Sequence, residues 1–327
     1  MRRRSIQDLE EFMPKVALKY LSEGKKVALA TVVSTWGSAP RGVGSQLAIS
    51  SDGEFEGSVS GGCVEGAVIV EALDAMSDGR CKLLEYGVAD EDAFAVGLAC
   101  GGDIKILVEP VDIGSGLKSE DLKTIVASFS DRKTIGYSIS LPEFERSELS
   151  NDDVRTGVKD ECFYLTYSPS PRLVIVGAVH ITKTLSSIAK MAGFDVYLVD
   201  PRESFASAAR FPEDIFLEGW SDEALQDLGI DANTAIVTLS HDPKIDTPAL
   251  EVALKSDAFY IGSLGSKKTH GKRIAQLQSL GFSDAEIDKI HSPIGLNIGS
   301  KTPPEIAISI MAEITKVFHD RKVRDSS

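Results

Sequence analysis

The sequence has few cysteines and no long apolar run. Its cysteines are Cys63, Cys81, Cys100 and Cys162. They have neither the paired spacing of a zinc site nor the density of a disulfide-stabilised scaffold, which favours a reducing compartment. No segment needs a membrane, and acidic residues follow the basic residues 2–4, where a signal peptide would be apolar. We therefore expect a cytoplasmic protein with no membrane partner.

Positive charge is also scarce. The chain has 35 lysines and arginines against 49 aspartates and glutamates, which gives a formal net charge of -14. Proteins that bind nucleic acid need basic patches that release counterions from the phosphates. The composition therefore predicts no nucleic-acid partner, and any phosphate that the protein binds is expected on a small molecule.

The length and composition indicate a globular protein with more than one domain. The chain has 327 residues, of which 43% are hydrophobic and 26% charged, so it can bury more than one small core. One large α/β domain is the alternative. We expect an N-terminal domain over residues 1–112, a connector with a β-hairpin over 113–170, and a C-terminal domain over 171–327.

Two kinds of sheet are expected along the chain. In the first region, apolar β-branched runs predict strands at Lys26–Val33, Gln46–Ser50 and Ile104–Glu109, with a helix over Val64–Ser77 capped by Gly79. This predicts an α/β domain with a mixed sheet. The hairpin of the connector is predicted from two strand-like runs, Thr134–Leu141 and Cys162–Tyr167.

Strands and helices alternate in the second half, which is typical of a doubly wound parallel sheet, a Rossmann-like domain. The predicted strands are Leu173–Val176, Asp195–Val199, Thr234–Leu239 and Phe259–Ile261, and the helices between them are Ile181–Ala192, Ala224–Leu228 and Pro248–Leu254. A last helix is predicted from Thr302 as its cap, Pro303 in its first turn and Glu305 as the capping-box acid.

The strand ends of this parallel sheet form a candidate binding crevice. Gly177 follows the first strand, and Asp200 ends the second, where an acid commonly binds the ribose of a dinucleotide. Val179 stands where the second glycine of a dinucleotide fingerprint would let the backbone approach a pyrophosphate. A Rossmann-shaped domain without a cofactor is therefore as good an interpretation as one that binds NAD(P).

Other residues at these strand ends have two interpretations each. His180 is either a functional histidine or an ordinary residue at a helix start, and Arg202 follows Asp200 closely. Gly265 and Ser266, with the lysines after them, could surround a phosphate. Without a complete phosphate-loop pattern, an N-capped surface helix is the better interpretation of that stretch.

The segment from Ser58 to Glu65 is the most suggestive chemically. Gly61 and Gly62 free the backbone to form a nest of amides, with Ser60, in front of a helix, which predicts an anion site. A thiol at a helix N-terminus has a lowered pKa, so Cys63 is the leading candidate for a reactive residue.

Further candidates lie near this segment in the sequence. Cys100 is followed by two glycines, and flexible glycines also lie next to Cys63. If the two thiolates faced each other, they would suit a soft metal or a sulfur-transfer step. Small, buried, inert cysteines are the alternative. Glu65 could accept a proton, interact favourably with the helix dipole or be solvated in the first turn. Arg41 could bind a phosphate or be an ordinary surface residue.

The sequence resembles the xanthine dehydrogenase accessory family, XdhC/CoxI, over nearly its whole length. The matching stretches are Ala30–Ser38, Gly57–Glu65, Cys100–Gly102, Asp200–Arg202, Tyr260–Ser266, Pro293–Leu296 and Thr302–Ala307. The departure is Val179, where the family usually has glycine.

The resemblance implies a maturation factor that need not be an enzyme. Members of the family bind the molybdenum cofactor (molybdopterin), protect it while a cysteine desulfurase supplies sulfur, and deliver it to a xanthine-dehydrogenase-like enzyme. By this resemblance, Cys63 and Cys100 lie near the molybdenum, and the amides of Ser60, Gly61 and Gly62 bind the pterin phosphate.

Two rival functions remain open. An NAD(P)-dependent oxidoreductase would use His180, His241 or Asp242 as its acid or base. An interaction module would dock molybdenum enzymes with both sites empty. A homodimer is also expected.

Overall fold

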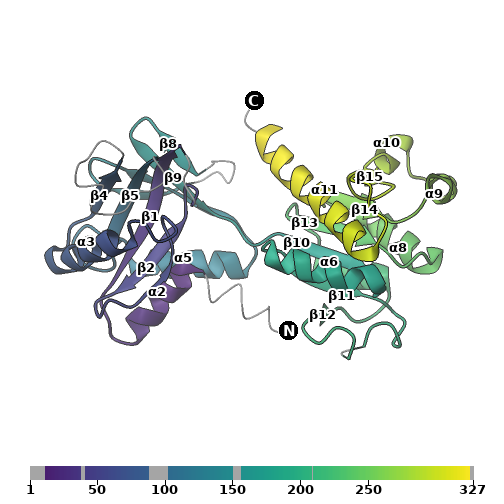
Figure 1. Cartoon of the computed structure of the whole chain (residues 1–327), viewed down its shortest axis with the longest axis horizontal. Helices are drawn as coiled ribbons and strands as arrows, with labels where there is room; N and C mark the ends of the chain where they lie inside the picture. The colour runs from purple at the N-terminus through teal and green to yellow at the C-terminus, as the bar shows by residue number, and fades with distance from the viewer. Residues whose placement is uncertain (1–11, 38–40, 88–101, 150–155, 208, 325–327) are drawn as a thin grey trace. The chain divides into compact units, whose positions relative to one another are not determined.

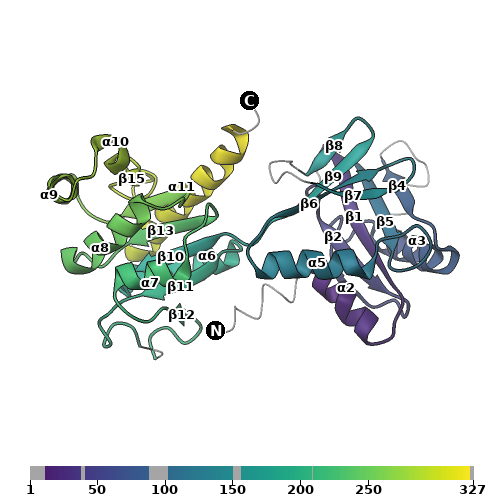
Figure 2. The same cartoon turned by 180° about the vertical axis from the view of Figure 1, so that it is seen from behind.

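The computed structural model describes residues 12–37, 41–87, 102–149, 156–207 and 209–324 (Figures 1 and 2). The chain divides into two compact units, Met1–Pro169 and Ser170–Ser327. Each unit has apolar cores of its own, so we describe each by itself.

A five-stranded sheet forms the centre of the first unit. Its strands, in spatial order, are β3 (Phe55–Gly57), β2 (Gln46–Ser50), β1 (Val27–Trp36), β5 (Asp103–Pro110) and β4 (Lys82–Tyr86). The α/β class is confirmed, but every pairing is antiparallel, which corrects the expected mixed sheet. The chain returns from β1 to β2 and from β2 to β3 through loops, which join antiparallel neighbours without a crossover helix.

Helices cover both faces of this sheet (Figure 1). On one face, α3 (Glu65–Asp78) packs against alternate residues of β1 and β5, and it ends at Gly79 as predicted. On the other face lie α2 (Met13–Ser22) and α5 (Ser119–Ser130). The fully buried residues of β1 alternate between the two faces, because successive side chains of a strand point in opposite directions.

The segment expected to be a connector packs against this same unit. The predicted hairpin runs are observed as β6 (Ile135–Ser140) and β9 (Cys162–Tyr167), which pair antiparallel. The edge strands β7 (Arg146–Glu148) and β8 (Gly157–Lys159) complete a second sheet of order β7-β6-β9-β8. Its apolar side chains share a core with Val33 of β1 and Leu107 of β5, so burial joins the segment to the first unit.

The second unit has the predicted Rossmann-like sheet. Its strands, in spatial order, are β12 (Ile215–Phe216), β11 (Asp195–Val199), β10 (Arg172–Val176), β13 (Thr234–Thr238), β14 (Tyr260–Ser263) and β15 (Ile290–His291). All these neighbours pair in parallel. The strand order reverses between β10 and β13, and ligands of doubly wound sheets bind at such a point.

Helices lie on both faces of the parallel sheet (Figures 1 and 2). One face packs against α6 (His180–Met191) and α11 (Pro303–Arg324), and the other against α7 (Ser221–Leu228), α8 (Pro243–Leu254) and α9 (Lys267–Ser279). The short α10 (Asp284–Ile287) follows α9. None of the helices in the described ranges is both long and apolar enough to cross a membrane.

Two helix starts show how well local signals predict boundaries. The carboxylate of Glu305 accepts hydrogen bonds from the amides of Lys301 and Thr302 at 2.7 and 2.9 Å, which is the part that Glu305 plays in the predicted capping box. In contrast, α8 begins five residues before the predicted start at Pro248. Its cap is Asp242, whose side chain accepts from the amide of Lys244 at 2.9 Å.

Candidate functional site

The predicted reactive thiol lies on a loop that precedes α3. Cys63 is partly buried and packs against the apolar cluster between α3 and the first sheet. The loop leaves the sheet beside β2, where the amide of Ser58 donates to the carbonyl oxygen of Gln46 at 3.0 Å. The thiol is therefore carried by a loop that is anchored on one side by the sheet and on the other by the helix.

The carboxylate of Glu65 lies inside this loop. Its Oε1 accepts hydrogen bonds from the Ser58 hydroxyl at 2.8 Å and from the amides of Val59 and Ser60 at 3.1 and 2.9 Å. Its Oε2 accepts from the Ser60 hydroxyl and from the amide of Gly62 at 2.8 Å. Glu65 thus binds five donors from the residues before Cys63.

The predicted amide nest is formed, but the chain supplies the anion itself. Gly61 and Gly62 have φ angles of 78° and 112°, a region that side chains rarely adopt, which lets the backbone curl around the carboxylate. The amide of Gly61 donates to the Ser58 hydroxyl at 2.9 Å. The amides of Ser60, Gly61 and Gly62 thus already have acceptors within the chain, and their binding of a pterin phosphate stays a prediction.

Glu65 is a structural anion in this arrangement. Burial alone would raise its pKa, but hydrogen bonds from Ser60 and Ser58 outweigh that effect and lower the pKa to about 2. An efficient general base has a pKa near the working pH, so this carboxylate is poorly suited to accept a proton.

The other candidate residues of the first half differ in position and burial. Arg41 is exposed in the loop between β1 and β2. Cys100 lies outside the described residues, three positions before β5. Cys81 is buried, and burial raises the pKa of its thiol to about 11, in keeping with an inert cysteine. Within the described ranges, no three His, Cys, Asp or Glu side chains gather in a way that could hold a metal ion.

In the second unit, two loops meet closely at the reversal of strand order. Gly177, at the end of β10, has a φ angle of 108°, and a Cβ atom there would lie 2.6 Å from the amide nitrogen of Ser240 after β13. Only glycine permits this approach. The predicted turn is therefore present, and its glycine is explained by the packing of one loop on the other.

Val179 is accommodated without backbone strain. Its φ of -90° and ψ of -175° are extended, and its side chain packs against the core under α6. The Val179 amide donates to the Thr182 hydroxyl at 3.2 Å, and that hydroxyl donates to the carbonyl oxygen of Gly177 at 2.6 Å. Hydrogen bonds within the chain thus hold the turn where the family usually has glycine. His180 is exposed at the first position of α6.

Asp200 and Arg202 form a pair at the end of β11. The carboxylate accepts from Arg202 Nε at 2.8 Å and Nη2 at 2.7 Å, and from the Ala178 amide at 2.7 Å. Although burial raises the pKa of Asp200, these hydrogen bonds bring it below its usual value. The guanidinium also lies 4.0 Å from the ring of Phe205. A ribose would have to share Asp200 with these partners.

Gly265 and Ser266 lie at the start of α9. The Ser266 hydroxyl accepts from the amide of Thr269 at 3.2 Å, as the N-capped interpretation expects. Gly265 lies close to Thr269, with the Arg273 guanidinium nearby. The structure thus brings Gly265 and Ser266 to the same edge of the sheet as Gly177 and Asp200, because parallel strands end on one side.

Sequence reasoning missed two buried charged residues at this edge. Asp246 of α8 accepts from the Ser240 hydroxyl at 2.6 Å, and burial raises its pKa. Arg273 of α9 donates to the carbonyl oxygen of Leu264 at 3.1 Å and to the Ser292 hydroxyl at 3.4 Å. The sequence carried one signal for Asp246, because an aspartate stands there on the otherwise apolar face of a helix.

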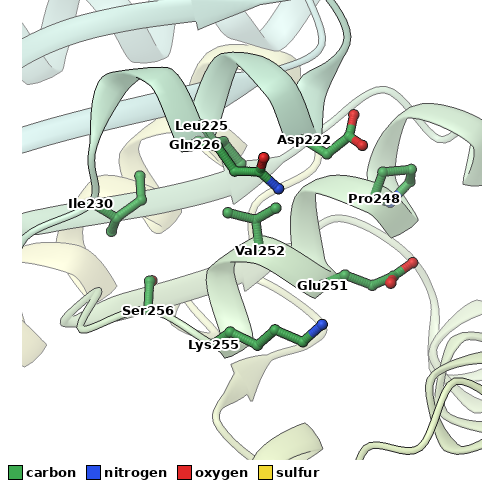
Figure 3. Close-up of a pocket in the computed structure, with 9 residues that line it drawn as sticks. All are labelled: Asp222, Leu225, Gln226, Ile230, Pro248, Glu251, Val252, Lys255 and Ser256. Carbon is green, nitrogen blue, oxygen red and sulfur yellow. The ribbon is translucent and has the colours of Figure 1, made fainter.

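A pocket of about 460 Å³ lies elsewhere on the second unit, between α7 and α8 (Figure 3). It is lined by Asp222, Leu225, Gln226, Ile230, Pro248, Glu251, Val252, Lys255 and Ser256. These residues belong to the two helices and the turns after them, so the pocket does not include the candidate residues at the strand ends.

Comparison with known proteins identifies both halves of the chain. Residues 20–87 match the XdhC and CoxI family, and residues 173–314 match the XdhC Rossmann domain. A crystal structure described as a xanthine dehydrogenase from Bacillus halodurans is similar, with a TM-score of 0.75 and 25% identity. The similarity covers 94% of this chain and 96% of that one.

Two curated proteins are similar over most of their length. A protein of Bacillus subtilis described as a probable subunit of xanthine dehydrogenase is 26% identical over 321 residues, 90% of this chain and 94% of that protein. The molybdenum cofactor insertion chaperone PaoD of Escherichia coli is 30% identical over 301 residues, 92% of this chain and 86% of PaoD. The chain therefore belongs to the XdhC/CoxI family.

Proposed function

We propose that the protein binds the molybdenum cofactor as cargo, protects it and delivers it to a xanthine-dehydrogenase-like molybdenum hydroxylase. The observation that carries this proposal is the alignment of 92% of the chain with a molybdenum cofactor insertion chaperone. The alignment extends across both units, so it supports a shared function of the whole chain rather than of one domain.

Cys63 is the residue that we assign to the metal-bearing end of the cargo. Thiolate sulfur is a soft ligand, and the thiol lies on a loop of defined shape between the first sheet and α3. Glu65 already holds the nearby amides, so the cargo phosphate binds elsewhere. Cys100 is the proposed second thiol, and the Gly177 turn with Asp200 and Arg202 is the proposed nucleotide-binding part.

The proposed role is that of a chaperone rather than a catalyst. Glu65 is poorly suited to proton transfer because of its lowered pKa. The partners that we propose are a recipient molybdenum enzyme, a cysteine desulfurase that supplies sulfur and a second copy of this chain. The proposed location is the cytoplasm, where thiols stay reduced.

The test is retention of released cofactor. The purified protein is mixed, without oxygen and under reducing conditions, with molybdenum cofactor from a donor enzyme, and unbound cofactor is removed by gel filtration. We expect molybdenum and pterin to co-elute with the wild type in stoichiometric amounts. In Cys63→Ser we expect most of the retention to be lost, because a hydroxyl is a poor ligand for a soft metal.

Cys162→Ser is the matched control. Cys162 is also a partly buried free thiol, but it lies on β9 and not in the Cys63 loop. It should retain cofactor as the wild type does. Absence of retention by the wild type would overturn the proposal, and titration of the second unit with NAD(P) would then be the next measurement. Equal retention by Cys63→Ser and wild type would remove the role of Cys63.

A further inference from the structure

We propose that Glu65 is a positioning residue that fills the amide nest in place of an outside anion and thereby fixes the Cys63 thiol. Its importance for the cargo rests on the proposed function. The hydrogen-bonded arrangement itself does not, so the two can be tested separately.

The network holds both neighbours of Cys63. On one side, the amide of Gly62 donates to Glu65 Oε2 at 2.8 Å. On the other side, the amide of Val64 donates to the Ser60 hydroxyl at 3.0 Å, and the same hydroxyl donates to Glu65 Oε2. The backbone before and after the thiol is therefore tied to one carboxylate, directly or through one hydroxyl.

Charge and burial make this carboxylate hard to replace. The Glu65 residue is 8% exposed and stands at the first position of α3, where a negative charge interacts favourably with the helix dipole. All five of its described partners are donors. A glutamine would present an NH₂ group to part of this donor set and could not accept there.

The filled nest also determines which ligands the loop accepts. A phosphate or sulfate would have to displace Glu65 from its five hydrogen bonds and would meet its negative charge. The loop therefore excludes small oxyanions and leaves the thiol for a softer, metal-bearing group.

The test measures the reactivity of the Cys63 thiol with iodoacetamide, resolved by peptide mass spectrometry. Glu65→Ala removes a negative charge beside the thiol and releases the backbone on both sides of it, so the rate of Cys63 alkylation should rise several-fold. Added formate should enter the vacated nest and return the rate toward that of the wild type. Formate should leave the wild-type rate unchanged.

Two controls separate positioning from general loss of stability. Alkylation of Cys162 in the same molecules should stay constant. Glu305→Ala removes another carboxylate that accepts helix-start amides, in the second unit, and should leave the Cys63 rate unchanged. Glu65→Gln preserves the size of the side chain and should give a smaller increase, because its oxygen can still accept.

An unchanged Cys63 rate in both Glu65 variants, or a raised rate that formate does not lower, would overturn the proposal. If the wild type retains no molybdenum cofactor but alkylation responds as described, the positioning role stands and the proposed function fails. If cofactor is retained equally by the wild type and by both Glu65 variants, with unchanged alkylation in both variants, the proposed function stands and the positioning role fails.

Discussion

The hydrogen bonds of Glu65 depend on its negative charge. We expect Glu65→Gln to lower the free energy of unfolding by about 2 kcal/mol near neutral pH, since part of the hydrogen bonds to a charged group is lost. The folded-state pKa is lowered from 4.5 to about 2. The stabilisation is therefore complete above the unfolded value and is lost as the pH falls toward the folded value.

Urea unfolding of both proteins from neutral pH downward measures this dependence. The difference between wild type and variant should be constant down to the unfolded pKa of the carboxyl group and should then shrink. A difference that stays the same at every pH would show that the carboxylate charge does not stabilise the loop.

Backbone geometry also shows why glycine is required at one position of the dinucleotide-type turn after β10 and not at the other. Val179 adopts an extended backbone that any residue tolerates, whereas Gly177 contacts the backbone of Ser240. The glycine that the fold requires is present. The position where a ligand would need a glycine carries valine instead.

At the scale of elements, the strands between residues 135 and 167 contribute to the core of the first unit. Phe163 of β9 is fully buried in a cluster with Val33 and Leu107. We expect Phe163→Ala to lower the free energy of unfolding of that unit by about 3–5 kcal/mol, through lost burial and a residual cavity. Chemical denaturation followed by circular dichroism measures the change.

Val158 of the edge strand β8 provides the control, because its side chain is 46% exposed. Val158→Ala should change the stability by no more than about 0.5 kcal/mol. If Phe163→Ala were equally mild, the segment would be a tethered hairpin, as the sequence suggested, and not part of the core.

The elements that the sequence predicted well are those with strong local signals. The runs at 46–50, 162–167 and 195–199 have the predicted bounds, because apolar β-branched stretches end at polar or turn residues. The strand β4 and the helices α2 and α5 were not predicted. The two helices bury residues at helical spacing on one face, a local signal that was missed. The residues of β4 are only partly buried or exposed, so its place in the sheet depends on tertiary contacts.

At the scale of the whole molecule, the chain has two compact units with separate cores. We expect calorimetry to resolve two unfolding transitions. Phe163→Ala should lower the midpoint of one by several degrees, and Leu185→Ala, a fully buried change in α6, should lower the other. A single transition that both substitutions move equally would show that the units unfold together.

The sequence by itself determined the Rossmann-like alternation of the second half, the cap of its last helix and the glycine-rich loop before α3. These features are local, because periodicity, capping residues and turn residues act over a few positions. Only the tertiary structure decided that Glu65 occupies the nest, that Arg202 holds Asp200 and that the first sheet is antiparallel. Which acceptor satisfies a donor depends on groups that the fold brings within about 3 Å of each other, and no sequence spacing fixes that distance.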